Sequence, residues 1–158
     1  MLWLLLALLI ALILSAAGAL LIYRSAPPVV KLIGLRPERL SATGQALQAK
    51  LRIQNPASLP LPIRAMTYHV WLGQQEIATG AGSFAHWVPA RGEAVIEVKV
   101  SADVKRLAGA VPALALQRQP WPYRLAGTLT PITGLSIGYD HHGEIDARGI
   151  LKLAASLR

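Results

Sequence analysis

The hydrophobic pattern divides the chain into an apolar N-terminal run and a longer alternating part. Residues 1–22 contain no charged and almost no polar side chain. As a helix with a rise of 1.5 Å per residue the run is about 33 Å long, enough to cross a hydrocarbon core of about 30 Å. Trp3 and Tyr23 flank it, where amphipathic aromatic side chains favour the membrane interface. The pattern predicts a single membrane-spanning anchor over residues 1–23, ended by Arg24.

An apolar N-terminal run is also typical of a cleaved secretory signal. The segment Ala17-Gly18-Ala19 offers an A-x-A cleavage site. No Lys or Arg precedes the run, however, and Leu20-Leu21-Ile22 stays apolar beyond that site. The pattern therefore favours a signal anchor that is retained, with cleavage as the alternative.

The side of the membrane that carries the rest of the chain is ambiguous. All cations near the run follow it, and the positive-inside rule taken literally places the domain in the cytoplasm. The bias is weak because the N-terminal tail is nearly absent and because whole domains are translocated regardless of charge. Both orientations stay open on the residues alone.

Beyond a proline-containing linker over residues 24–28, apolar and polar residues alternate. Leu47, Ala49, Leu51 and Ile53 alternate with polar residues, as in a strand with one buried and one wet face. Comparable stripes predict further strands at roughly 29–40, 66–72, 76–78, 95–100, 123–129 and 135–139.

Six to eight short strands separated by turns are typical of an antiparallel, immunoglobulin-like β-sandwich. The sequence predicts this all-β domain over residues 29–148 and a C-terminal tail over 149–158. One segment departs from the alternation: Ser101 as N-cap and Asp103 in the first turn predict a short helix, which Pro112 limits.

The amino-acid composition excludes several classes of protein and of functional site. Hydrophobic residues make up 53% of the chain and charged residues 15%, which excludes intrinsic disorder. The absence of cysteine excludes disulfides, thiolate metal sites, cysteine nucleophiles and lipid attachment through cysteine. No G-x-S-x-G element or phosphate-binding glycine loop is present, so we assign no catalytic residue and expect no enzyme.

One stretch carries a family resemblance. Leu51-Arg52-Ile53-Gln54-Asn55-Pro56, followed by Leu59-Pro60-Leu61-Pro62-Ile63, resembles the strand–Asn-Pro–turn–strand signature of the late embryogenesis abundant type 2 group, also called the water stress and hypersensitive response domain. The opening strand at 30–35 and the hairpin at 68–80 continue the match. The motif residues are Asn55, Pro56, Pro60, Pro62, Gly73 and Gly80.

The resemblance implies a fibronectin-III-like sandwich without enzymatic activity or cofactor. It also implies a role in desiccation or other water stress, by shielding client proteins or membrane surfaces. Bacterial relatives are often exported and tethered, which favours a single-pass protein of the cytoplasmic membrane with a periplasmic domain. Many of those relatives carry a lipobox cysteine, so its absence here points to anchoring by the helix itself.

The net charge of +8 offers a second indication. Four basic residues on predicted wet faces could contact anionic lipid headgroups, namely Lys50, Arg52, Arg64 and Arg124. A basic face could also bind nucleic acid, but no motif in which aromatic residues interleave with basic ones supports that use. A different alternative is an anchored module that docks one protein partner through a sheet edge or a tryptophan-bearing face.

A polar cluster near the C-terminus is the remaining chemical candidate. It offers five possible ligands for Zn, Ni or Cu, namely Asp140, His141, His142, Glu144 and Asp146. On a strand Asp140 and His142 share a face. The competing interpretation is a solvated hairpin turn around Gly143. We therefore predict no metal site and keep the cluster as an alternative.

Overall fold

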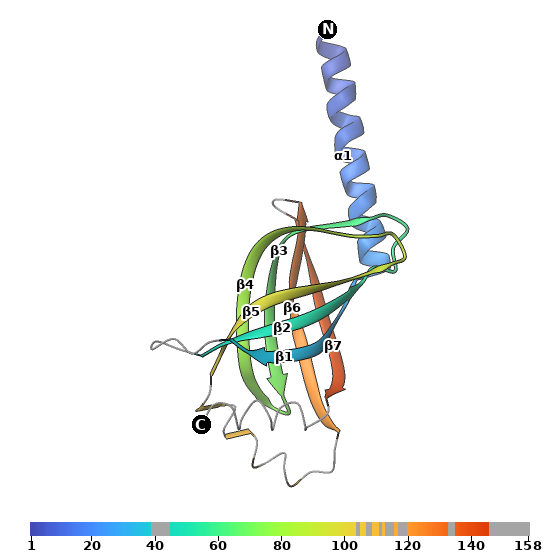
Figure 1. The fold of residues 1–158 in the computed structure, drawn as a ribbon. Helices are drawn as coiled ribbons and strands as arrows, with labels where there is room; N and C mark the ends of the chain where they lie inside the picture. The colour runs from blue at the N-terminus through green and yellow to red at the C-terminus, as the bar shows by residue number, and fades with distance from the viewer. Residues whose placement is uncertain are drawn as a thin grey trace.

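The computed structural model describes residues 1–38, 45–103, 105–106, 109–110, 112, 116, 120–132 and 135–145. One long helix precedes seven strands (Figure 1). The elements are α1 (Leu2–Ser25), β1 (Val29–Pro37), β2 (Gln45–Gln54), β3 (Leu61–Leu72), β4 (Gln75–Val88), β5 (Glu93–Ala102), β6 (Trp121–Ile132) and β7 (Leu135–Ile145).

The strands form one antiparallel sheet in the order β1-β2-β5-β4-β3-β6-β7. Its two halves are joined at a corner, because β4 and β5 pair only at Ala78–Ala102 and Thr79–Ser101. The sheet curls until β1 approaches β7, so the domain is a sandwich that nearly closes into a barrel (Figure 1). The predicted all-β antiparallel sandwich after a long apolar helix is confirmed.

The alternating stripes face the interior as predicted. In β2, Leu47, Ala49, Leu51 and Ile53 are all no more than 1% exposed. The stripe of β3 is likewise buried, and Gly73 turns the chain into β4 with a φ of 62°, a conformation that glycine adopts without strain. Burial of these apolar faces between the two halves of the sheet is what favours the fold.

Two local predictions are corrected. Ser101 is not a helix N-cap, because it continues β5 and pairs with Ala46 of β2. Asp103 takes that place, since its Oδ1 accepts the Arg106 N–H at 3.1 Å. Residues 105–106, 109–110 and Pro112 are helical, so Pro112 does not end the helix before itself, and residues 104, 107–108 and 111 lie outside the described residues.

The predicted turn around Gly143 is also wrong. Gly143 lies inside β7, directly opposite Tyr123 of β6. A side chain at this position would meet the tyrosine ring, which explains the glycine without a turn. The predicted tail over 149–158 lies outside the described residues.

Three tyrosines share one arrangement with a glycine. Each faces a glycine on the neighbouring strand, lies across it and hydrogen-bonds the main chain of a strand beyond. The pairs are Tyr68 over Gly80, Tyr139 over Gly127 and Tyr123 over Gly143. The hydroxyl groups of Tyr68 and Tyr139 donate to the carbonyls of Lys99 and Thr67, at 2.5 and 2.7 Å. The Tyr123 hydroxyl accepts the Leu32 N–H at 3.3 Å.

Two of these crossings fall at the seams of the sandwich. The Tyr68 hydroxyl joins β3 to β5 where the β4–β5 pairing is short, and Tyr123 joins β6 to β1 where β1 and β7 form no ladder. The third tyrosine, Tyr139, joins β7 to β3 across β6, inside one half of the sheet. Tyr68 and Tyr123 therefore hold the nearly closed barrel together at its seams.

Candidate functional site

The Asn-Pro element lies beside the base of the helix. Asn55 is 2% exposed and is the one buried polar side chain among the residues that the structure describes. Its Oδ1 accepts the Ala57 N–H at 3.1 Å, which closes a local turn, and its Nδ2 donates to the Leu59 carbonyl at 2.8 Å. The single amide thereby fixes the whole connection between β2 and β3.

The same amide ties this connection to a second loop. Asn55 Nδ2 also donates to the Pro89 carbonyl at 3.1 Å, and the Asn55 N–H donates to the Gly92 carbonyl at 2.8 Å. The Arg91 N–H in turn donates to the Ala57 carbonyl at 3.0 Å. We call residues 55–60 and 89–92 the paired loops.

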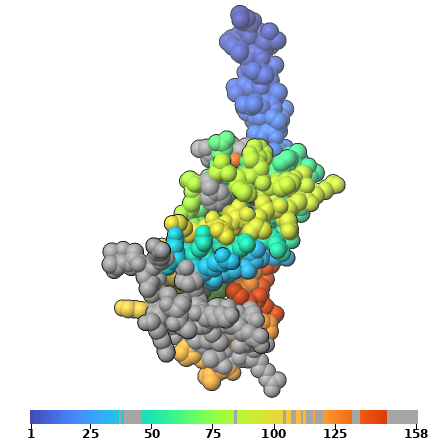
Figure 2. Space-filling model, viewed as in Figure 1, coloured from blue at the N-terminus to red at the C-terminus, as the bar shows by residue number. Residues whose placement is uncertain are grey.

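The helix is held against the first of the paired loops. The Tyr23 hydroxyl donates to the Pro60 carbonyl at 2.5 Å, and Tyr23 is only 7% exposed. Ala19, Ile22 and Ala26 pack against the sandwich core. The last turns of α1 are therefore part of the folded domain, although the rest of the helix stands clear of it (Figure 2).

The other motif residues have separate local roles. Pro56 and Pro60 are exposed in the paired loops, and Pro62 is half-buried in β3 opposite Trp87. Gly73 makes the β3–β4 turn, and Gly80 leaves room for the Tyr68 ring. None of them offers a polar side chain to a ligand.

The four basic residues named from the sequence do not gather on one surface. Lys50 and Arg52 lie on β2, and Arg52 Nε is 3.8 Å from Glu93 Oε1. Arg64 is exposed near the start of β3. Arg124 lies near the start of β6, at the end of the domain opposite the helix (Figure 1).

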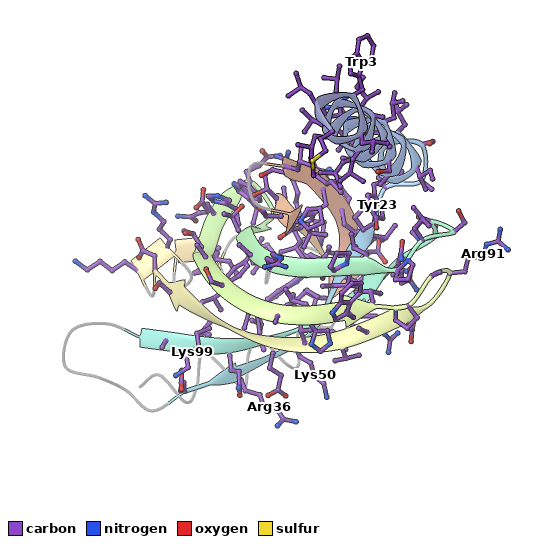
Figure 3. All side chains as sticks on the ribbon, turned by 90° about the horizontal axis from the view of Figure 1, so that it is seen from above. Trp3, Tyr23, Arg36, Lys50, Arg91 and Lys99 are labelled. Carbon is purple, nitrogen blue, oxygen red and sulfur yellow. The ribbon has the colours of Figure 1, made fainter. Side chains whose placement is uncertain are left out.

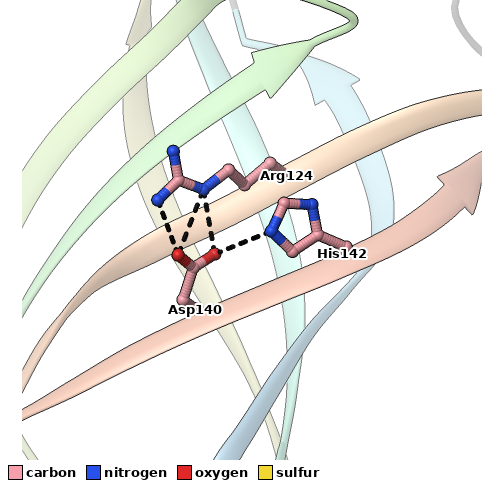
Figure 4. A network of polar contacts seen from close by, with 3 residues as sticks. All are labelled: Arg124, Asp140 and His142. Carbon is pink, nitrogen blue, oxygen red and sulfur yellow. Dashed lines mark hydrogen bonds and ion pairs between the residues drawn. The ribbon is translucent and has the colours of Figure 1, made fainter.

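Arg124 belongs to a row of polar and aromatic side chains on the outer face. Its Nε and terminal nitrogen donate to Asp140 at 2.9 and 2.6 Å, and Asp140 Oδ1 is 3.5 Å from His142 Nε2 (Figure 4). The guanidinium lies 4.8 Å from the centre of the Trp71 ring. Hydrogen bonding by Arg124 lowers the pKa of Asp140 below its ordinary value. The carboxylate therefore stays ionised and paired.

The row continues onto the next strands. Trp71 stacks on His69 with ring centres 5.7 Å apart, and His69 Nδ1 is 3.3 Å from Glu76 Oε1. A groove of about 410 Å³ opens beside this row at the β3–β4 turn, lined among others by Trp71, Gln74 and His142. The arrangement pairs charges and shields an aromatic ring. It does not place a nucleophilic side chain next to a general base.

The polar cluster of β7 is split between the two faces of the strand. Asp140 and His142 share the outer face as predicted, whereas His141 points the other way toward Tyr123, with ring centres 6.1 Å apart. Burial lowers the pKa of His141, and the nearby Lys31 adds to the shift. Within the described residues no group of three His, Asp or Glu could hold a metal ion; Asp146 lies outside them, and Glu144 is exposed.

The tryptophans likewise do not form one face. Trp121 is 1% exposed inside the core, Trp71 is half-buried under Arg124, and Trp87 is 67% exposed near the end of β4. Sequence reasoning missed Arg91 and the buried role of Tyr23. The Pro89-Ala90-Arg91-Gly92 turn composition was a signal for the loop, but its pairing with Asn55 depends on contacts that are distant in sequence.

A family model described as late embryogenesis abundant protein matches residues 50–143, more than half of the chain. The chain belongs to this family. The matched region runs from β2 into β7 and includes the Asn55 element and all three tyrosine–glycine pairs. No curated protein matches the sequence significantly.

One solved structure supports the fold. A protein of Arabidopsis thaliana determined in solution is 18% identical, with a TM-score of 0.55 over 77% of this chain and 82% of that one. A crystal structure from Archaeoglobus fulgidus is 12% identical, with a TM-score of 0.46 over 74% of this chain and 94% of that one. At 18% identity, the likeness to the Arabidopsis protein extends to the fold and no further.

Proposed function

We propose that this protein is a membrane-anchored stress-protection domain that works without catalysis. The observation that carries the proposal is the fusion of a late embryogenesis abundant domain to a 24-residue apolar helix. Residues 2–17 of that helix are exposed, so their apolar side chains lack a protein partner within the described chain. A lipid bilayer is the environment that satisfies such a helix.

The proposed mechanism is weak shielding at the bilayer surface. The sandwich presents scattered charges over a rigid, well-packed body, and the anchor raises its local concentration next to membranes. Client proteins or anionic headgroups near the surface would be separated from one another during water loss. The side of the membrane proposed for the domain is the periplasm, with a cytoplasmic domain as the alternative.

The test is drying and rehydration of vesicles that carry the full chain. An aggregation-sensitive enzyme is added, and recovered activity and vesicle leakage are measured. The control is an unrelated β-sandwich of equal size and charge on the same anchor. Better recovery than the control supports protection, and recovery equal to the control refutes it.

A second candidate function is docking of one partner at a sheet edge. From Gly80 to Val88, β4 pairs only with β3 among the described residues, and this stretch contains no Lys, Arg, Asp, Glu or Pro. An edge without such residues accepts an added strand readily. Ala85→Lys would place a charge on the edge. It should abolish capture of a stoichiometric partner without lowering the melting temperature, and unchanged capture would reject this use of the edge.

A further inference from the structure

The apolar part of α1 reaches the domain without a polar spacer. Residues 1–23 contain no charged side chain, and Leu20-Leu21-Ile22 is apolar. Ala19 and Ile22 already pack against the sandwich core, and Tyr23 is only 7% exposed. Leu21 is 64% exposed on the same turn, so an apolar side chain still faces a lipid environment where the helix touches the domain.

The domain therefore cannot hang below the bilayer on a free tether. Where the helix leaves the hydrocarbon, the surface that holds it lies at the level of the lipid headgroups. The Tyr23–Pro60 hydrogen bond fixes which surface this is, because it joins the helix to the paired loops. Figure 1 shows the two loops beside the last turns of α1.

The exposed side chains of the paired loops suit contact with headgroups. They are Pro56, Ser58, Leu59, Pro60, Pro89, Ala90 and Arg91. Neither loop contains an acidic residue, and Leu59 is 36% exposed. Arg91 projects from the tip of its loop, well away from Lys50 on the outer side of the sheet (Figure 3). Trp87, two residues before this loop, adds an exposed aromatic ring, a side chain enriched at membrane interfaces.

We propose that the paired loops rest on the headgroup layer of the bilayer that holds α1, with Arg91 facing lipid phosphates. The proposal rests on the anchoring proposed above. Asn55 holds the two loops together, and Tyr23 fixes them to the helix, so the sandwich takes one orientation on the membrane. Its opposite end, with the β3–β4 turn and the Arg124 row, then faces water.

The experiment uses the full chain in vesicles of phosphatidylcholine and phosphatidylglycerol. Because the chain contains no cysteine, single cysteines can carry a nitroxide label whose access to oxygen and to a water-soluble nickel chelate reports depth. Ala90→Cys reports the paired loops, and Gln74→Cys in the exposed β3–β4 turn is the matched control. Leu9→Cys reports the anchor independently.

The label at residue 90 should show several-fold less access to the nickel chelate than the label at residue 74. Equal access at both positions, with residue 9 in hydrocarbon, would overturn this inference while leaving the anchor intact. A water-exposed label at residue 9 would overturn the anchor and this inference together. In the Ala90→Cys background, Arg91→Glu should raise chelate access in vesicles with phosphatidylglycerol. If it does not, the assignment of Arg91 to lipid phosphates is wrong.

Discussion

Gly143 and Gly138, both on β7, allow a sharp test of the tyrosine crossings. A Cβ added at Gly143 would lie 2.7 Å from Cε1 and Cζ of the Tyr123 ring, whereas a Cβ at Gly138 meets nothing within 4 Å. Ordinary van der Waals contact begins near 3.4 Å, so the ring must move by about 0.7 Å. Such a shift strains the Tyr123 bond to the Leu32 N–H, which is already 3.3 Å long.

The expected changes in the free energy of unfolding differ in sign between Gly143→Ala and Gly138→Ala. Replacing glycine by alanine inside a strand gains about 0.5–1 kcal/mol from the unfolded chain. Overpacking costs about 1–3 kcal/mol, and loss of the hydrogen bond costs about 1 kcal/mol more. Gly143→Ala should therefore destabilise the fold by about 1–3 kcal/mol, and Gly138→Ala should be neutral or stabilising.

The assay is thermal and urea unfolding of the full chain in detergent micelles, followed by near-ultraviolet circular dichroism. A loss of 1 kcal/mol corresponds to a fall of about 2–4 °C in melting temperature for a chain of this size. The decisive variant is Gly143→Ala combined with Tyr123→Val, which removes the ring. There the alanine should no longer destabilise. If Gly143→Ala costs as much without the ring as with it, the reasoning is refuted.

Three further predictions concern polar groups. Asn55→Ala should lower the free energy of unfolding by at least about 2 kcal/mol, because it leaves the buried Ala57 N–H without its acceptor and part-buried carbonyls of both paired loops without their donor; urea unfolding measures this. The pKa of His141 lies below its ordinary value of 6.5, so the folded chain binds fewer protons than the unfolded chain, and stability should fall as pH drops through 6.5 and below. His141→Gln should flatten that part of the stability–pH curve, and an unchanged slope would exclude His141 as its source. A double-mutant cycle on Arg124→Gln and Asp140→Asn should give a coupling free energy close to zero, because both side chains are more than 40% exposed.

The strands were predictable because their signal is local. The stripe of β2, and that of β3 ending at Leu72, alternate with period two, and the side chains that they placed in the core are buried. Asn55-Pro56 could be recognised as a turn for the same reason. The hydrogen bonds from Asn55 to the second loop could not be predicted, because Pro89 and Gly92 come close to Asn55 only in the folded chain.

Glycine was the residue most easily misinterpreted. Gly73 and Gly143 both break an apolar pattern, and only Gly73 makes a turn. A glycine inside a strand is also needed where an aromatic ring from the neighbouring strand lies across it. Whether Gly143 is such a glycine depends on the register of β6 and β7. The register places Tyr123 opposite Gly143. These two residues are far apart in the sequence, and no local pattern predicts that they face each other.

The position of the Asn-Pro element links the fold to the anchor. Asn55 holds Leu59, the next residue along the chain is Pro60, and the Pro60 carbonyl receives the Tyr23 hydroxyl. A turn in the middle of the sandwich would serve folding alone. A turn that also receives the base of α1 holds that helix to the sandwich. If α1 is the proposed membrane anchor, the same buried amide that stabilises the domain also sets how the domain stands on the membrane.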